Sequence, residues 1–217
     1  MTRARACHAA TAVVAWTAIV VQLVLVIQGG AILDEVNPPT LPLRVGRFFS
    51  YFTIQSNILV AVTATQLARN PGRDGTWWRP VRLAALVGIT VTGVVHFFLL
   101  RPLLDLDGAD FVADKLLHMV VPVIAIACWA VFGPRPRVTW REIGLALCWP
   151  LVWLAWTLIM GAASGWYPYP FLDHREDGGA IGVVVTSIGI TAFFLVLFVL
   201  ARWIDQRTQP APRVAAD

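Results

Sequence analysis

The chain of 217 residues is 58% apolar and only 14% charged, whereas soluble globular domains carry about 25% charged residues. This composition leaves no room for a separate soluble domain and predicts an integral membrane protein. The net charge of +4 does not imply a nucleic-acid partner, because basic residues beside anionic lipid account for it.

Six apolar stretches follow one another along the chain, at residues 9–27, 46–67, 81–100, 116–132, 143–163 and 181–200. Each is close to the ~20 residues that a helix needs to cross a bilayer. The first stretch follows Arg3 and Arg5 as a signal peptide would, but it is longer than the 7 to 15 apolar residues typical of one, so we expect it to be retained. We predict an all-α polytopic membrane bundle of six transmembrane helices at residues 9–202, with an N-terminal segment at 1–8 and a tail at 203–217.

The basic residues predict the orientation of this bundle, since they collect on the cytoplasmic side. Twelve of the 17 lie on the side shared by the two termini, the second-to-third loop and the fourth-to-fifth loop. The opposite side keeps five basic residues but holds nine of the 13 acidic ones. Both termini are therefore expected in the cytoplasm. Sixteen of the 17 basic residues are arginine, a bias associated with GC-rich bacterial genomes, so we expect a bacterial plasma membrane.

Cysteine and histidine give no sign of a metal or cofactor site. Cys7, Cys128 and Cys148 are scattered, which predicts neither a disulfide framework nor a metal centre. The four histidines lack a ligand spacing such as an i, i+4 pair. No cofactor is expected.

Polar residues inside the second span are the first candidates for function, because polar groups are costly in hydrocarbon. Ser50, Thr53 and Asn57 share one helical face. A threonine in such a helix usually bonds the carbonyl one turn back, and a Ser/Asn face usually joins neighbouring helices. Both structural interpretations stay open beside a functional one.

The fourth span opens with Asp114 and His118, which lie four residues apart on one face. The carboxylate can hold one imidazole nitrogen and leave the other aimed into the bundle. Pro122 should kink this helix, because it lacks the N–H that would bond the carbonyl of His118. With rises of 1.5 Å per residue, Thr53 and His118 lie roughly 10 Å and 5 Å inside their spans, which is the same depth within the uncertainty of the boundaries. His96 belongs to the same layer, and an interfacial, hydrogen-bonded histidine is the alternative.

The loop before the last span carries the aromatic residues Trp166, Tyr167, Tyr169 and Phe171 together with two prolines. Prolines restrict the conformations of the loop, so it can serve as a lid over a site between the helices. An aromatic anchor at the membrane interface is the equally plain interpretation.

Three short sequence segments follow one another along the chain: Tyr51-Phe52-Thr53, then His118 to Pro122, then Gly165 to Asp173. Together they resemble the androgen-induced gene product and androgen-dependent TFPI-regulating protein family, and especially its prokaryotic six-span relatives. The vertebrate members are multi-pass threonine hydrolases that cleave fatty acid esters of hydroxy fatty acids. The resemblance implies a nucleophile at Thr53 and a histidine base at His118. Gln55-Ser56-Asn57 and the acidic loop before His118 depart from that pattern.

The predicted function is therefore an intramembrane hydrolase of lipid esters, with membrane lipids and fatty-acyl esters as its partners. Thr53 attacks the ester, His118 takes its proton, and Asp114, Asn57 and His96 support them, with Asn57 as a candidate oxyanion donor. The competing class is a non-enzymatic membrane protein that binds lipid, transports a solute or docks on a partner. Transport is disfavoured, because the sequence shows no inverted repeat, no broken-helix pair and no charge in the middle of a span.

Overall fold

The computed structural model describes residues 1–29 and 39–208, and these residues form helices and short connections without a β-strand. The all-α expectation is confirmed for this part of the chain. Asp34 and Glu35, two of the nine acidic residues counted on the side opposite the termini, and the end of the expected tail lie outside the described residues. The α-helices are α1 (Arg3–Gln28), α2 (Leu41–Ser50), α3 (Phe52–Arg69), α4 (Trp78–Val95), α5 (Gly108–Lys115), α6 (Val121–Phe132), α7 (Trp140–Ser164) and α8 (Gly179–Arg207).

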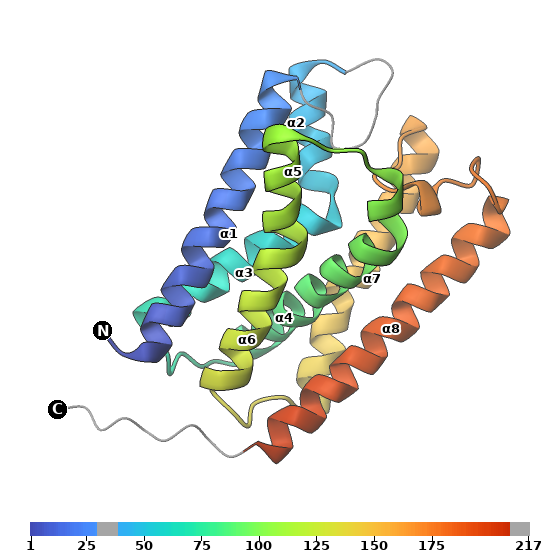
Figure 1. Ribbon diagram of the computed structural model, residues 1–217. Helices are drawn as coiled ribbons and strands as arrows, with labels where there is room; N and C mark the ends of the chain where they lie inside the picture. Colours follow the sequence, from blue (N-terminus) through green and yellow to red (C-terminus); the bar gives the residue numbers. More distant parts are fainter. Residues whose placement is uncertain (30–38, 209–217) are drawn as a thin grey trace.

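Five helices in the described residues are long and apolar enough to cross a membrane: Arg3–Gln28, Trp78–Leu103, Gly108–Phe132, Trp140–Ser164 and Gly179–Arg207. They support a multi-pass membrane protein. The helices at the two ends of the chain are longer than expected, since α1 begins at Arg3 and α8 runs to Arg207. The start of α1 and the end of α8 lie at the same end of the bundle (Figure 1).

The expected second span is not one helix, because the chain breaks at Tyr51 between α2 and α3. Tyr51 has extended backbone angles, with φ −67° and ψ 131°. A break inside a bundle leaves carbonyl groups without helical partners. The indole Nε1 of Trp153 donates to the carbonyl of Ser50 at 2.9 Å and satisfies one of them. The prediction of a continuous helix over 46–67 is wrong. Apolar periodicity cannot reveal this break, because the hydrogen bond that stabilises it comes from another helix.

Helix α3 packs mainly against α1 and α4 (Figure 1). Both helices carry small, fully buried side chains: Ala15 and Ala18 on α1, and Ala61 on α3. Small residues let helix backbones approach closely, which is the usual source of cohesion between helices in lipid. Helix α4 packs in turn against α6, α7 and α8. The first turn of α3 is thereby enclosed on several sides.

A disulfide joins Cys7 of α1 to Cys128 of α6. The expectation that the cysteines form no disulfide is wrong for this pair. Residues 121 positions apart give no signal in sequence spacing, and only the antiparallel packing of α1 and α6 brings them together. Cys148 is free and exposed.

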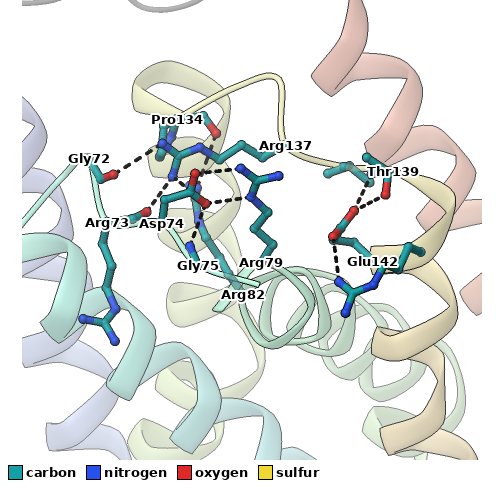
Figure 2. Close-up of polar contacts among 12 residues, drawn as sticks. Gly72, Arg73, Asp74, Gly75, Arg79, Arg82, Pro134, Arg137, Thr139 and Glu142 are labelled. Carbon is teal, nitrogen blue, oxygen red and sulfur yellow. Dashed lines mark hydrogen bonds and ion pairs between the residues drawn. The ribbon is translucent and has the colours of Figure 1, made fainter. Parts of the chain in front are cut away.

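Polar contacts join the loops at the end of the bundle that carries most of the basic residues (Figure 2). Asp74 accepts two hydrogen bonds from Arg79, each at 2.7 Å, and lies 3.5 Å from Arg137. The hydrogen bonds from Arg79 hold the pKa of the Asp74 carboxyl well below its usual value. Arg137 also donates to the carbonyl of Arg73 at 2.5 Å. The loop after α3 is thus tied to the loop after α6.

The buried carboxylate of Asp205 ties α8 into the same end of the bundle. Its Oδ2 accepts from the backbone N–H groups of Arg137 and Val138 at 2.5 and 2.7 Å. Two N–H groups ahead of helix α7 would otherwise lack an acceptor. One side chain therefore fixes both the connection from α6 to α7 and the last turns of α8.

Candidate functional site

Thr53 occupies the first turn of α3, immediately after the break at Tyr51. Other threonines of the bundle, such as Thr63 and Thr90, bond the carbonyl four residues back within their own helix. The carbonyl four residues before Thr53 belongs to α2, which the break at Tyr51 separates from α3. The Thr53 hydroxyl is therefore free to contact other helices.

The Thr53 hydroxyl lies 3.3 Å from Nε2 of His118, within hydrogen-bond distance. Thr53 is 8% exposed, so the contact lies inside the bundle. The structure brings together the two residues that were expected to form a dyad. Their catalytic roles stay a prediction.

The carboxylate of Asp114 lies between two histidines. Its Oδ1 is 2.9 Å from Nδ1 of His118 and 3.3 Å from Nε2 of His96. The backbone carbonyl of Asp114 lies 3.0 Å from the same Nδ1 of His118. The expected i, i+4 contact between Asp114 and His118 is present, and it leaves Nε2 of His118 for Thr53. Lys115 donates a hydrogen bond to the other carboxylate oxygen at 2.9 Å.

Both histidines lie in π-helical turns, His96 at His96–Leu100 and His118 at Leu116–Val120. A proline follows each turn, at positions 102 and 122. A proline has no N–H for the carbonyl four residues back and its ring crowds that carbonyl, so a wider turn before it relieves the clash. The kink expected at Pro122 thus takes the form of a π-turn. π-Turns within α-helices occur frequently at functional sites.

The two imidazole rings are stacked, with centroids 3.8 Å apart and planes inclined by 11°. His96 is 2% exposed. The pair sits where α4 closely approaches α6, since a Cβ added at Gly93 would lie 3.1 Å from the carbonyl oxygen of His118. The stacking and the shared carboxylate together fix the orientation of the His118 ring.

His96, Asp114 and His118 also offer three donor atoms within 4.8 Å of one another, which is close enough for one metal ion. The lone pair of an imidazole nitrogen lies in the plane of its ring. The planes of two nearly parallel rings stacked 3.8 Å apart meet only far from the rings, so one ring would have to rotate before both could bind one ion. The observed ring orientations therefore do not suit the binding of one ion by both histidines.

Asn57 links α3 to the π-turn that carries His118 by hydrogen bonds. Its amide nitrogen donates to the carbonyl of Thr53 at 2.9 Å and to that of Leu117 at 3.3 Å. Both amide hydrogens are thereby engaged with backbone. The expected role as an oxyanion donor would require one of these bonds to break, so the geometry favours a role in holding the two helices together.

The loop from Trp166 to Phe171 closes over this site, and its aromatic side chains point in different directions. Tyr169 is buried, and its hydroxyl lies 3.2 Å from the backbone nitrogen of Thr53 and 3.3 Å from the Thr53 hydroxyl. Phe171 stacks on Tyr169 with centroids 5.2 Å apart. Tyr167 instead faces His174, at 3.4 Å, and Trp166 lies beneath the guanidinium of Arg47.

Burial raises the pKa of the Tyr169 phenol above its usual value. The hydroxyl therefore keeps its proton at neutral pH and can donate it. Nothing in the sequence pattern pointed to a contact between Tyr169 and Thr53, because the two are 116 residues apart and Tyr169 lies in a loop without periodicity.

Two cavities meet at Thr53. The first, of about 60 Å³, is almost entirely apolar and lies among α4, α7 and α8. The second, of about 50 Å³, reaches from α1 to α5 and includes His96, Asp114 and His118. Three residues line both cavities: Thr53, Leu100 and Tyr169. Thr53 thus stands between an almost entirely apolar cavity and one whose lining includes the histidines and Asp114. No family model matches the chain, and no curated protein or solved structure is significantly similar to it.

Proposed function

We propose that this protein is a multi-pass membrane hydrolase of lipid esters, in which Thr53 is the nucleophile and His118 the general base. The observation that carries the proposal is the 3.3 Å separation of Thr53 Oγ1 and His118 Nε2 inside the bundle, with Asp114 on the opposite ring nitrogen. A nucleophile, a base and a group that orients the base are the recurring parts of such sites. The resemblance to the androgen-induced gene product family adds to this argument.

In the first half of the reaction, Thr53 Oγ1 bonds to the ester carbonyl carbon while its proton passes to Nε2 of His118. The carbonyl electron pair moves to oxygen and gives a tetrahedral oxyanion. When this intermediate collapses, the bond to the alcohol oxygen breaks and His118 returns the proton to the leaving alcohol. In the second half, His118 takes a proton from water, the water oxygen bonds to the acyl carbon, and Thr53 leaves with the proton restored.

The two cavities fit the two parts of an ester. The apolar cavity is bordered by α8, whose span is the least buried of the five. An acyl chain from the bilayer can reach Thr53 from that side. The second cavity, which borders His118 and Asp114, takes the alcohol portion and the hydrolytic water.

The proposed membrane arrangement has six crossings, with α2 and α3 together forming the second, and both termini in the cytoplasm of a bacterial plasma membrane. The distribution of basic residues supports it. The Cys7–Cys128 disulfide lies at the same basic end, and disulfides are rare in reducing compartments, which argues for the opposite orientation. A topology reporter fused after Asp217 decides between the two arguments, and periplasmic activity of the fusion would overturn the orientation.

A lipid-binding protein without catalysis is the second candidate, because an apolar cavity open to the bilayer also suits a carrier. The two functions differ in whether the Thr53 hydroxyl reacts. A carrier needs the cavity and not a nucleophile.

The test uses purified protein in lipid nanodiscs, treated with a fluorophosphonate probe and assayed with a fluorogenic long-chain acyl ester. Thr53→Ala and His118→Ala should each abolish labelling and lower hydrolysis by 100-fold or more, since general-base catalysis contributes roughly 10²- to 10⁴-fold. Thr63→Ala is the matched control, because Thr63 is a buried threonine of the same helix whose hydroxyl bonds only its own helix. Equal labelling of the wild type and Thr53→Ala would leave the carrier as the better explanation.

A further inference from the structure

The contacts around Tyr169 allow a chain of hydrogen bonds that runs in one direction, with the phenol as the donor to the Thr53 hydroxyl. The Thr53 N–H donates to the phenol oxygen at 3.2 Å. The phenol proton then remains for the Thr53 hydroxyl oxygen, 3.3 Å away. The Thr53 hydroxyl proton remains in turn for Nε2 of His118, whose Nδ1–H faces Asp114. The resulting chain delivers the Thr53 proton to the base.

Tyr169 also stands where negative charge would develop during ester cleavage. Thr53 lies in the first turn of α3, where backbone N–H groups have no carbonyl partner within the helix and the helix dipole favours an anion. The phenol oxygen now occupies the acceptor position on the Thr53 N–H. Among the described residues that line both cavities, Tyr169 is the one that offers a side-chain donor besides Thr53 itself.

We infer that Tyr169 is a catalytic residue of the proposed hydrolase, holding the Thr53 hydroxyl toward His118 before attack and donating to the oxyanion afterwards. This inference rests on the proposed function. Once Thr53 Oγ1 is bonded to the acyl carbon, the oxyanion oxygen is attached to that same carbon, so the phenol O–H turns about its C–O bond and donates to the oxyanion in place of Oγ1. The Thr53 N–H, on the same side of the site, supplies the second donor. No proton leaves Tyr169 in this step.

The packing around Tyr169 suits this role. Its ring is held by Phe171 on one face, by the edge of Tyr51 at 5.6 Å and by Trp153 at 6.0 Å. A rigid ring keeps the hydroxyl near Thr53 without a cost in side-chain entropy at the moment of reaction. The aromatic loop thus contributes a donor to the reaction in addition to covering the site.

The test compares Tyr169→Phe with wild type, Thr53→Ala and Thr63→Val in the same nanodisc assay, with thermal unfolding measured for each. Removing one oxyanion donor typically lowers kcat by about 10²- to 10³-fold, so Tyr169→Phe should lower kcat by roughly 100-fold. KM should stay within about twofold, because the interaction forms only after attack. The rate of fluorophosphonate labelling should fall in parallel. Thr63→Val, which also removes a buried hydroxyl, should keep both rates.

The outcomes distinguish a failure of the inference about Tyr169 from a failure of the proposed hydrolase function. Activity retained in Thr53→Ala refutes the proposed function itself. Activity lost in Thr53→Ala but kept in Tyr169→Phe refutes only the role of Tyr169. If Tyr169→Phe does not fold, Tyr169→3-fluorotyrosine replaces it, because that residue keeps the hydroxyl and its packing but is a more acidic phenol. A changed kcat with a wild-type KM then supports the inference, and an unchanged kcat overturns it.

Discussion

Asp114→Asn tests whether the histidine base is held in the tautomer that Thr53 needs. The Asp114 carboxylate faces nitrogen atoms on both oxygens: Nδ1 of His118 and, at 3.3 Å, Nε2 of His96 near Oδ1, and Lys115, which donates to Oδ2. A carboxylate accepts on both oxygens, whereas an asparagine must turn its NH₂ toward one side. Lys115 is partly exposed and can swing into water, so we expect the NH₂ to face Lys115 and the carbonyl to stay on the imidazoles.

The expected loss of kcat depends on which hydrogen-bond acceptors of Nδ1 of His118 remain after the substitution. In serine hydrolases, the same substitution lowers kcat by about 10⁴-fold because it selects the wrong tautomer. Here the backbone carbonyl of Asp114 also accepts from Nδ1, at 3.0 Å, and the substitution leaves it in place. The loss is then the difference between a charged and a neutral hydrogen bond, about 1.4 kcal/mol, or tenfold in kcat.

Two measurements check this prediction. Hydrolysis of the acyl ester should fall about tenfold in kcat, given the loss of about 1.4 kcal/mol. ¹⁵N spectra of histidine-labelled protein should show His118 protonated on Nδ1 in both proteins, a result that does not depend on catalysis. Asp107→Asn is the matched control, because Asp107 precedes α5, is exposed and makes no capping hydrogen bond. An unchanged kcat, or a His118 protonated on Nε2 in the wild type, would refute the orienting role of Asp114.

Three further predictions concern stability, measured by thermal unfolding in detergent. Asp205→Ala should cost about 1–3 kcal/mol or more, because it leaves the buried N–H of Val138 and the partly buried N–H of Arg137 without an acceptor, and a loss no larger than that of Asp205→Asn would contradict this. Gly161→Ala should destabilise, because its Cβ would overlap the ring of Tyr167, whereas Gly144→Ala, with open space around it, should not. Asp74 has a lowered pKa in the folded state, so its contribution, about 0–1 kcal/mol at this partly exposed site, is present above pH ~4 and is lost as pH falls below it. The stabilities of wild type and Asp74→Asn should therefore converge at low pH.

The sequence determined those features that depend on neighbouring residues. Five of the six predicted apolar stretches correspond to helices long and apolar enough to cross a membrane, because hydropathy is a local property. Asp114 and His118 were paired correctly, since residues four apart always share a helical face. The proximity of Thr53 and His118 followed from depth counting together with a family resemblance, and the structure places their side chains in contact.

Tertiary structure alone decided the break at Tyr51, the Cys7–Cys128 bond and the position of Tyr169. The break survives because Trp153, on another helix, satisfies the freed carbonyl of Ser50. The disulfide and the contact of Tyr169 with Thr53 join residues more than 100 positions apart. Each depends on how helices and loops pack against one another. Hydropathy and helical periodicity describe the surroundings of a residue along the chain, whereas a hydrogen bond or a disulfide depends on where two side chains meet in space.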